Sequence, residues 1–297
     1  MFLTKIMVIN MYFILGYFMK KIKILKEEDG NTLLRMAFYI FLPAILFQSI
    51  RKIDFKPGYL AYPLVILVMY LFIAIMVLTY LKIKKTEKDT MKIVAGYFSM
   101  ANIGFLYPFY IAIFGEENVW RLGLLDFGNS IFVYAVSYAY IVGAERKRDL
   151  AKKVFTAPGI IALALALACN FAGIKFFTPV EDFLNQLGNL TGFSMLFSLG
   201  LFFNFRLGEL KESIKIVFAK EILKFIILLI IYNLNIEFYI KSAFMLIIVS
   251  PVASSLLNFS LFARLDTKFV SKLISISMLI SFIEIPIVVY FLQKLQY

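Results

Sequence analysis

Windows of about twenty mostly apolar residues recur from one end of this sequence to the other. A helix rises about 1.5 Å per residue and the hydrocarbon core of a bilayer is about 30 Å thick, so about twenty apolar residues span it. The windows that approach this length predict ten spans, at residues 4–19, 32–50, 59–81, 93–114, 121–143, 158–174, 185–205, 216–234, 238–263 and 269–293. We therefore expect an all-α polytopic membrane protein.

Composition and patterning support helices in a bilayer over the other fold classes. Hydrophobic residues make up 62% of the 297 positions and charged residues only 17%, too apolar a balance for a water-soluble globule of this size. A membrane β-barrel would show short segments of alternating polarity, whereas runs such as FIILLIIYNL do not alternate. The sequence thus excludes both a soluble domain and a barrel.

The net charge of +12 is explained by where the basic residues lie. When four basic residues at span ends (Lys5, Arg121, Lys241 and Lys272) are counted with the adjoining loop or chain end, the loops after odd-numbered spans have 20 Lys and Arg residues. The loops after even-numbered spans and the two ends have 8. By the positive-inside rule, the odd loops face the cytoplasm and both termini lie outside the cell membrane. The basic excess therefore indicates topology and contact with anionic lipid, and we expect no nucleic-acid partner.

The chain offers no room for a soluble domain. Its longest polar connection, AERKRDLAKKVFTAP, is too short to fold alone, so we expect a first half at residues 1–145, a cytoplasmic linker at 146–157 and a second half at 158–297. The first span lacks a small-residue cleavage site and is interpreted as retained. With Cys169 as the single cysteine, neither an internal disulfide nor a thiolate metal cluster is expected.

Two of the expected spans are interrupted by polar and helix-breaking residues. One contains SMANIGFLYPFYIAIFG with Pro108, and the other contains IIVSPVASSLLNFSLF with Pro251. Each lies in the fourth span of its half, and each is followed by a short polar turn and a final helix. Since each half has five spans, two halves of the same fold must be inverted relative to each other. The sequence predicts two inverted five-helix repeats.

The interruptions also predict a binding site. A proline inside a helix removes a donor, and every unmet backbone group in hydrocarbon costs several kcal/mol, so such a break must be buried in protein. Proline kinks can also serve packing alone, but two at matching positions, flanked by polar residues, favour a site for a solute. We expect the hydrogen bonds to substrate or ion to come from Asn102, Asn129, Ser250, Ser254 and Asn258. The shape of the helix breaks is expected to come from Gly104, Pro108 and Pro251.

Residues 101–134 resemble the fourth and fifth helices of the auxin efflux carrier family. That family's pattern is Asn, Gly, a proline shortly after, then Gly-Glu-Glu and a later Asn, and the residues that match it are Asn102, Gly104, Pro108, Gly115, Glu116, Glu117 and Asn129. LLRMAFYIFLPAILFQSI with Pro43 resembles the second helix of the family, and SPVASSLLNFSLFARLD with Pro251 the ninth. The likeness extends over essentially the whole chain.

The resemblance implies a ten-helix inverted repeat related to the bile-acid sodium symporter fold, with broken fourth and ninth helices crossing at the substrate site. The first two helices of each half would form a scaffold and the last three a moving transport domain. Members carry organic anions, such as auxin in plants and malonate-like dicarboxylates in prokaryotes. This chain departs from the family at Tyr107, where many members have glycine, and at Glu284, where small or hydroxyl residues are usual.

Some charges remain inside the expected spans, where each costs at least roughly 2.5 to 3.5 kcal/mol near the bilayer centre. Arg35 and Lys220 are within about a turn of the cytoplasmic face, so we expect both to snorkel to it. Lys224 is deeper. It can pair with Glu221 one helical turn earlier, or it can contact the carboxylate of a substrate, and the sequence leaves both open.

Two acidic residues are candidates for ion coupling. Asp126 lies three residues from Asn129 and can cap, pair or carry a proton. Glu284 has no basic residue in its own span until Lys294, so it is expected to be isolated. A buried carboxyl without a partner favours its neutral form, and we hypothesise that Glu284 or Asp126 takes up the coupling proton. Because histidine is absent, any relay must use carboxylates or water.

Together these features predict a secondary transporter of a small organic anion that works by alternating access. No Gly-rich phosphate loop is present, so ATP is not expected as the energy source, and no cofactor or metal is expected. Without histidine there is no Ser-His dyad or His-ligated zinc, so we do not expect an enzyme. A passive channel or a receptor-like protein on the same scaffold is the alternative. Proton, sodium and membrane potential stay open as driving forces, and so does a homodimer.

Overall fold

A computed structural model describes residues 2–143, 156–203 and 211–296. Within these ranges the chain is helical apart from connecting turns and an isolated β-bridge. Each of the ten expected spans coincides with one or more helical segments, which confirms the helical fold class. Residues 146–155 of the expected linker lie outside the described ranges.

The chain divides into two compact units, each built from separate stretches of sequence. Unit 1 comprises Met1–Pro57, Gly104–Gly123 and Phe155–Phe205, and unit 2 comprises Gly58–Ile103, Leu124–Val154 and Arg206–Tyr297. Unit 1 thus contains the first two expected spans of each half, which the family resemblance assigns to a scaffold. Residues 104–123 depart from that partition, because they cluster with unit 1 although they belong to the later spans of the first half.

Unit 1 is a group of antiparallel and crossing helices. Its elements are α1 (Phe2–Lys21), α2 (Glu27–Met36), the π-helical turn η1 (Ala37–Phe41), α3 (Leu42–Arg51), α6 (Ile103–Phe114), the 3-10 turn η3 (Glu116–Asn118), α10 (Pro158–Phe171) and α11 (Thr178–Phe202). The long helix α11 packs against α1, α2 and α3, and α10 packs against α3. The core of this unit therefore forms around α3 and α11.

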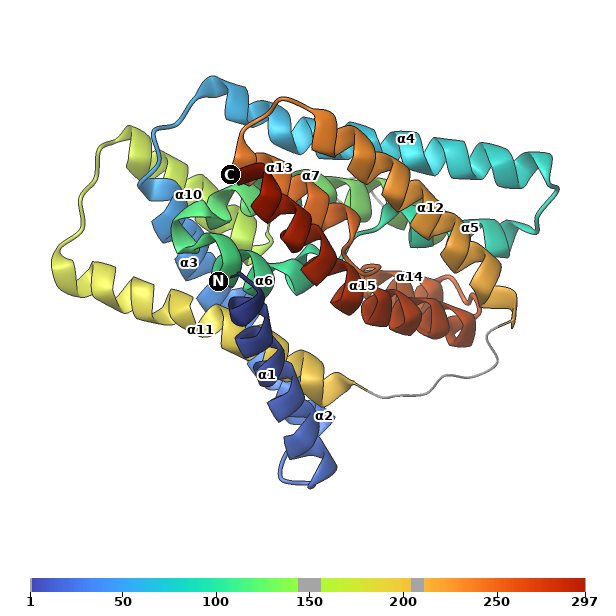
Figure 1. Ribbon diagram of the computed structural model, residues 1–297, viewed down its shortest axis with the longest axis horizontal. Coiled ribbons are helices and arrows are strands. Elements are labelled where there is room, and N and C mark those ends of the chain that lie inside the picture. Colours follow the sequence, from blue (N-terminus) through green and yellow to red (C-terminus); the bar gives the residue numbers. More distant parts are fainter. Residues whose placement is uncertain (1, 144–155, 204–210, 297) are drawn as a thin grey trace. The chain divides into compact units, whose positions relative to one another are not determined.

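Figure 1 shows α1 crossing α11, and two glycines allow the close approach. A Cβ at Gly16 of α1 would collide with the carbonyl of Phe197, and a Cβ at Gly200 of α11 would collide with the carbonyl of Phe13. Each glycine therefore faces the backbone of the other helix. Small residues at such crossings are the usual means by which membrane helices pack, since lipid offers no hydrophobic driving force for association.

Pro43 is accommodated without ending its helix. A proline ring clashes with the carbonyl four residues earlier and lacks a donor. Here the preceding turn η1 widens, and the N–H of Leu42 donates to the carbonyl of Ala37, five residues back. The helical segment Glu27–Arg51 consequently stays continuous enough to count as one span.

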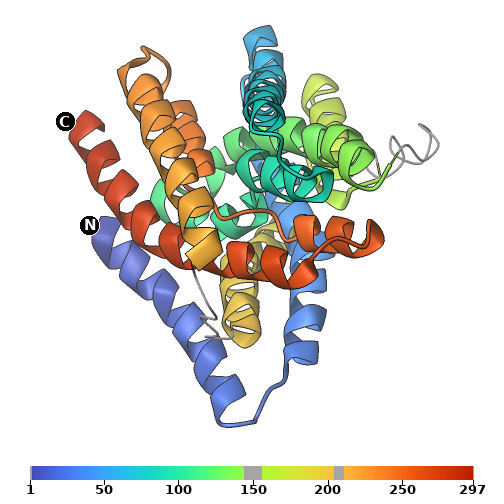
Figure 2. The same cartoon turned by 90° about the vertical axis from the view of Figure 1, so that its right-hand side faces the viewer.

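Unit 2 gathers the remaining helices. They are α4 (Ala61–Ile83), preceded by the 3-10 turn η2 (Pro57–Leu60), then α5 (Lys88–Ser99), α7 (Val119–Ile131, from Leu124 onward), the π-helical turn η4 (Phe132–Ser137), α8 (Tyr138–Ile141), α12 (Lys211–Asn233), α13 (Phe238–Ile248), α14 (Ser255–Phe262) and α15 (Thr267–Gln296). The helix α15 packs against α5, α12, α13 and α14, and α4 packs against α5. Figure 2 shows the non-helical connection between α13 and α14 in orange.

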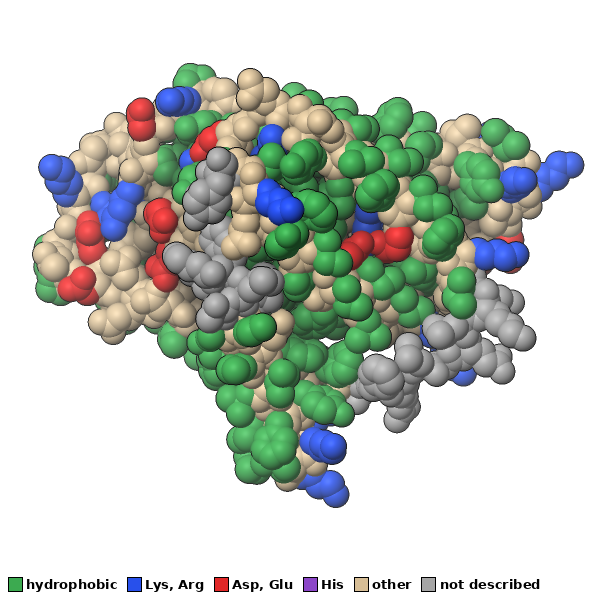
Figure 3. Space-filling view, viewed as in Figure 1, with side chains coloured by type: hydrophobic (Ala, Val, Ile, Leu, Met, Phe, Trp, Pro, Cys, Tyr) green, Lys and Arg blue, Asp and Glu red, His purple; other side chains and the backbone are tan. Residues whose placement is uncertain are grey.

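Length and composition identify three helical segments of the described chain that could each cross a membrane unaided. They are Glu27–Arg51, Pro57–Ile83 and Thr267–Leu295. The helices α6, α10 and α13 are apolar but shorter, in two cases because an interruption divides the expected span. Many large hydrophobic side chains are exposed, among them Phe72, Ile75 and Phe218, and they cover much of the face in Figure 3. Such a surface suits lipid rather than water.

Candidate functional site: two paired helix interruptions

The first interruption lies at Met100–Asn102, between the end of α5 and the start of α6. Met100 has extended backbone angles, φ −109° and ψ 109°. The expectation that Pro108 marks this break is wrong, since Pro108 lies inside α6 and is buried there. Within unit 1, Pro108 lies against Gly192 of α11. A single proline costs a helix one donor, and α6 continues through it.

The second interruption covers Val249–Ser254, between α13 and α14. Pro251 lies in the middle of this stretch and is buried, so here the predicted proline does coincide with the break. The helix α13 stops just before it, where Val249 N–H still donates to the carbonyl of Met245. Ser250 N–H still reaches Ile247 O, but the N–H groups of Val252 and Ala253 need hydrogen-bond partners from elsewhere in unit 2.

The two interruptions supply those partners to each other. Ala101 and Val252 form an antiparallel bridge, in which Asn102 N–H donates to Pro251 O (2.8 Å) and Ala253 N–H donates to Met100 O (3.0 Å). This pattern makes Ala101 and Val252 a non-hydrogen-bonded pair, the kind whose side chains lie closest. Two stretches about 150 residues apart thus form a two-stranded junction inside unit 2.

A neighbouring serine completes the junction. Val252 N–H points away from Ala101 and donates to Ser277 Oγ on α15 (3.1 Å), and Ser277 Oγ donates to Ile274 O (2.8 Å). Ser277 is fully buried. Nothing in the sequence distinguishes Ser277, since a serine in a long apolar helix usually bonds the preceding turn. The bond from Val252 depends on how α15 packs against the break, which the sequence does not reveal.

Two polar side chains next to the junction are not fully hydrogen-bonded. Asn129 of α7 approaches the junction with its amide, which donates to Ala101 O at 3.5 Å and to Asp126 Oδ1 at 3.4 Å. The carbonyl oxygen of Asn129 and the hydroxyl of Ser250 are buried and lack a hydrogen-bond partner among the described residues. Buried polar atoms without partners are uncommon and indicate room for a water or a ligand.

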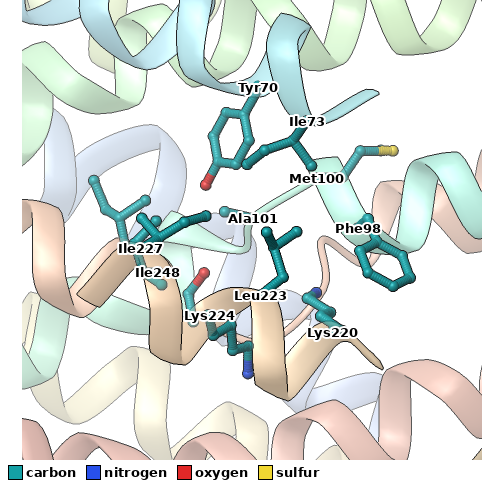
Figure 4. A pocket seen from close by; sticks show the side chains of 12 residues that line it. Tyr70, Ile73, Phe98, Met100, Ala101, Lys220, Leu223, Lys224, Ile227 and Ile248 are labelled. Atoms are coloured by element: carbon teal, nitrogen blue, oxygen red, sulfur yellow. The ribbon is translucent and has the colours of Figure 1, made fainter. Parts of the chain in front are cut away.

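A small cavity lies beside the junction, wholly within unit 2 (Figure 4). It has a volume of about 30 Å³, enough for roughly one or two water molecules, and Met100, Ala101 and Ser250 lie in its wall. Tyr70 of α4 lies on one side with its hydroxyl toward the centre, and Lys220 and Lys224 of α12 lie on the other. The apolar part of the lining comes from Ile73, Phe98, Leu223, Ile227, Ile247 and Ile248.

Lys220 does not snorkel to the surface, contrary to the sequence-based expectation. It is 6% exposed, and its ammonium donates to Tyr97 O at 2.7 Å and lies 4.4 Å from the centre of the Tyr97 ring. No carboxylate of the described chain lies within 4.0 Å of it, in contrast to Lys224. An ammonium has three donors, so Lys220 brings spare positive charge to the cavity wall.

Lys224 is part of a three-residue ion cluster. Its ammonium lies 3.0 Å from Glu221 Oε2 and 2.8 Å from Glu284 Oε2, and Lys224 itself is 4% exposed. The predicted pair between Glu221 and Lys224 is therefore present. Glu284, expected to be isolated, instead bonds Lys224 from α15, a partner 60 positions away that no local pattern reveals.

Several predicted site residues lie apart from this arrangement. Ser254 and Asn258 are exposed and do not line this cavity. Gly104 and Pro108 belong to unit 1, whereas Asn102, Pro251 and the other junction residues belong to unit 2. Lys220 and Tyr70 line the cavity although neither was predicted to do so from the sequence. The four-residue spacing of Lys220 and Lys224 does place both lysines on one face of a helix.

A second and larger cavity lies within unit 1, with a volume of about 520 Å³. Its polar lining consists of Gln48, Ser49, Lys52, Glu116, Glu117, Asn185 and Asn189. Ser49 joins two elements, since its hydroxyl donates to Glu117 O and accepts from Trp120 N–H, both at 3.2 Å. Beside the cavity, Arg51 pairs with Glu181 at 2.6 Å and donates to Gln48 at 3.0 Å.

The carboxylates give this larger cavity a negative character. Burial, together with the charge of the adjacent Glu117, raises the pKa of Glu116 above its usual range. The side-chain amide of Asn189, with its oxygen and nitrogen exchanged, donates to Glu116. In the described part of the chain, no group of three or more Asp, Glu, Cys or His side chains is placed to hold a metal ion.

Comparison with known proteins places these features in a family. Residues 1–152 match the family described as membrane transport protein. An uncharacterized transporter of Methanocaldococcus jannaschii is 29% identical over 212 residues, covering 66% of this chain and 67% of the relative. An uncharacterized transporter of Methanothermobacter thermautotrophicus is 29% identical over 205 residues, covering 65% of each. This chain therefore belongs to the membrane transport protein family, in agreement with the resemblance to auxin efflux carriers found in its sequence.

Proposed function

We propose that this transporter is a secondary carrier of a small organic anion, with its substrate site at the junction of the two helix interruptions in unit 2. The observation that carries the proposal is the pairing of Met100–Asn102 with Val249–Ser254 beside two buried lysines. Backbone that leaves the helix at membrane depth is tolerated only where it is buried or lines a cavity. Discontinuous helices of this kind form the substrate sites of many carriers.

The chemistry of the cavity favours an anion. Lys220 presents an ammonium with spare donors, and Ser250 presents a hydroxyl without a partner. Charge-assisted hydrogen bonds from an ammonium to a carboxylate are about twice as strong as neutral ones. The apolar lining suits the carbon skeleton of an auxin-like or malonate-like carboxylate.

The small volume of the cavity supports alternating access rather than a permanent pore. At about 30 Å³ the cavity is too small for a carboxylic acid, so substrate entry requires a rearrangement of the helices around it. In this account the chain is an inverted repeat in the cell membrane with both termini outside, unit 2 moves during transport, and no cofactor takes part. A passive channel or receptor-like protein is the competing proposal.

Thermal stability of the purified protein is the first test. A panel of acetate, benzoate, malonate and succinate is compared at two pH values, with and without sodium. Ligand binding to the native state raises the melting temperature, so an anion carrier should be stabilised by at least one member of the panel. Stabilisation that requires sodium or low pH identifies the coupling ion, whereas no shift with any carboxylate would contradict an anion site.

Counterflow in proteoliposomes separates a carrier from a channel. Vesicles preloaded with an unlabelled panel member that stabilises the protein should take up the labelled compound faster than empty vesicles, with saturation at high concentration. Flux that neither saturates nor responds to preloading would favour a channel.

A further inference from the structure

The ion cluster on α12 and α15 binds the two helices through a single ammonium group. Lys224 forms an ion pair with Glu221 on its own helix and donates a hydrogen bond to Glu284 on α15, and it also lines the cavity. The ion pair between Lys224 and Glu221 lies within α12, one helical turn apart, so it persists when α12 moves as a whole. The bond to Glu284 joins different helices and must break if they separate.

In their ordinary ionised forms, the charged side chains around the cavity balance one another. Lys220 and Lys224 would contribute two positive charges, and Glu221 and Glu284 two negative ones. The other titratable groups nearby are phenols, Tyr97 on α5 and Tyr70 on α4.

Asp126 on α7 is hydrogen-bonded by Asn129 and lies next to the junction rather than in the cavity wall. The helix α13 contributes only Ile247 and Ile248 to the lining, and Ser250 follows it. No further charged side chain of the described residues lines the cavity.

Entry of an anion upsets this balance. One carboxylate would leave a buried site with an excess negative charge, and an uncompensated charge in a low-dielectric interior is expensive. Two glutamates are already paired with Lys224, so a substrate carboxylate competes with them for the same ammonium group. A proton added to one glutamate removes both problems, because it restores neutrality and frees the ammonium.

On the basis of the proposed anion carrier, we propose that Glu284 binds one proton for each monovalent carboxylate that enters the cavity. Protonated Glu284 then releases the ammonium group of Lys224, which becomes available to the substrate. The proton comes from water and bonds to a carboxylate oxygen of Glu284. The carboxylate of the substrate then accepts hydrogen bonds from Lys220 and Lys224, and the net charge of the site is unchanged. Release of Glu284 from Lys224 loosens α12 from α15 next to the cavity, which gives the substrate room.

Infrared spectroscopy tests the proton site without any substrate. Purified protein is titrated toward low pH, and the carboxylic acid carbonyl band is compared between wild type, Glu284→Gln and Asp126→Asn. We expect one acid band of the wild type to be lost in Glu284→Gln and retained in Asp126→Asn. Survival of that same band in Glu284→Gln, or its loss in Asp126→Asn, would overturn the assignment. Should Glu284→Gln fail to fold, Glu284→Met carries the same expectation.

Proton uptake on anion binding tests the coupling. Benzoate is added to weakly buffered protein containing a pH-indicator dye, after a thermal shift has shown whether benzoate binds. Wild type should take up one proton per benzoate bound, and Glu284→Gln none while still binding benzoate. Equal uptake by both proteins would overturn the coupling. Absence of binding by every carboxylate of the panel would count against the anion carrier itself, and the infrared titration would still decide the role of Glu284.

Discussion

The two cavities of this transporter differ in both size and charge. Size favours one cavity as the substrate site, and charge favours the other. The unit 1 cavity holds about 520 Å³, within the range of small-molecule sites, whereas the unit 2 cavity holds about 30 Å³. Volume alone would place the substrate in unit 1. Yet the larger cavity is lined by Glu116 and Glu117, and the smaller one by Lys220 and Lys224.

Solvent exposure strengthens the case for the smaller cavity. Lys52, the lysine of the unit 1 cavity, has a side chain that is 51% exposed and lies 3.8 Å from Glu181, so water screens its charge. Lys220 and Lys224 are 6% and 4% exposed. Buried charges act more strongly on a ligand than exposed ones. The comparison teaches that the proposed anion site is better recognised by its buried charges than by the volume of a cavity.

The largest expected effect is on stability and comes from Lys224. Lys224→Met leaves Glu221 and Glu284 without their shared cation, and breaking a buried ion cluster in this way costs about 3–5 kcal/mol. Lys52→Met should cost at most about 1 kcal/mol, as for other exposed pairs. Chemical denaturation in detergent measures both. Comparable losses in the two variants would mean that the buried and exposed lysines do not differ as described.

Lys220 should have the next largest effect, on anion binding. Lys220→Met removes a charged donor worth about 1.5–3 kcal/mol, which corresponds to a loss of affinity of roughly 10- to 150-fold. Titration calorimetry with a carboxylate that stabilises the wild type measures it, and Lys52→Met serves as the control. Weaker binding in Lys52→Met with unchanged binding in Lys220→Met would move the substrate to the unit 1 cavity.

Two serines permit a matched test of the junction. Ser277→Ala leaves the buried N–H of Val252 unpaired, for a cost of about 1–3 kcal/mol, and should slow counterflow because the junction loses its anchor on α15. Ser49→Ala removes an equivalent acceptor from Trp120 N–H in unit 1. It should lower the melting temperature with counterflow retained. Equal transport losses in the two variants would argue against a special role for the junction.

The smallest expected effect concerns pH and the unit 1 cavity. Because the pKa of Glu116 is raised in the folded protein, folding favours its protonated form, and stability falls as the pH rises from the usual glutamate range to the raised value. Glu116→Gln should flatten this part of the profile of melting temperature against pH. Benzoate binding should stay as in the wild type, and a change in its affinity would give the unit 1 cavity a part in transport.

Much of the architecture could be predicted from the sequence because bilayer thickness imposes a length that can be counted. The ten apolar windows correspond to helical segments, and Pro251 marks the second break. Pro108 misled because a proline lowers the stability of a helix without deciding where it ends. The first break forms at Met100–Asn102, where backbone groups that have left the helix form hydrogen bonds with the second interruption.

The candidate site was less predictable because its contacts join distant parts of the chain. The pair of Glu221 and Lys224 is local and follows from helical spacing. Glu284 bonds Lys224 from another helix, and Ser277 reaches Val252 across 25 positions, so neither contact leaves a periodic signal. Lys220 was assigned to the surface from its distance along the span, but its neighbours in unit 2 cover it.

A disulfide across the junction tests the central claim most directly. In a Cys169→Ser background, Ala101→Cys and Val252→Cys are combined, since a non-hydrogen-bonded pair has Cα atoms about 4.5 Å apart, within the range that a disulfide spans. We predict that oxidation forms the bond within one chain and stops counterflow, and that reduction restores it. Failure to form the bond in folded protein, or full transport with the bond in place, would contradict a substrate site built from the two paired interruptions.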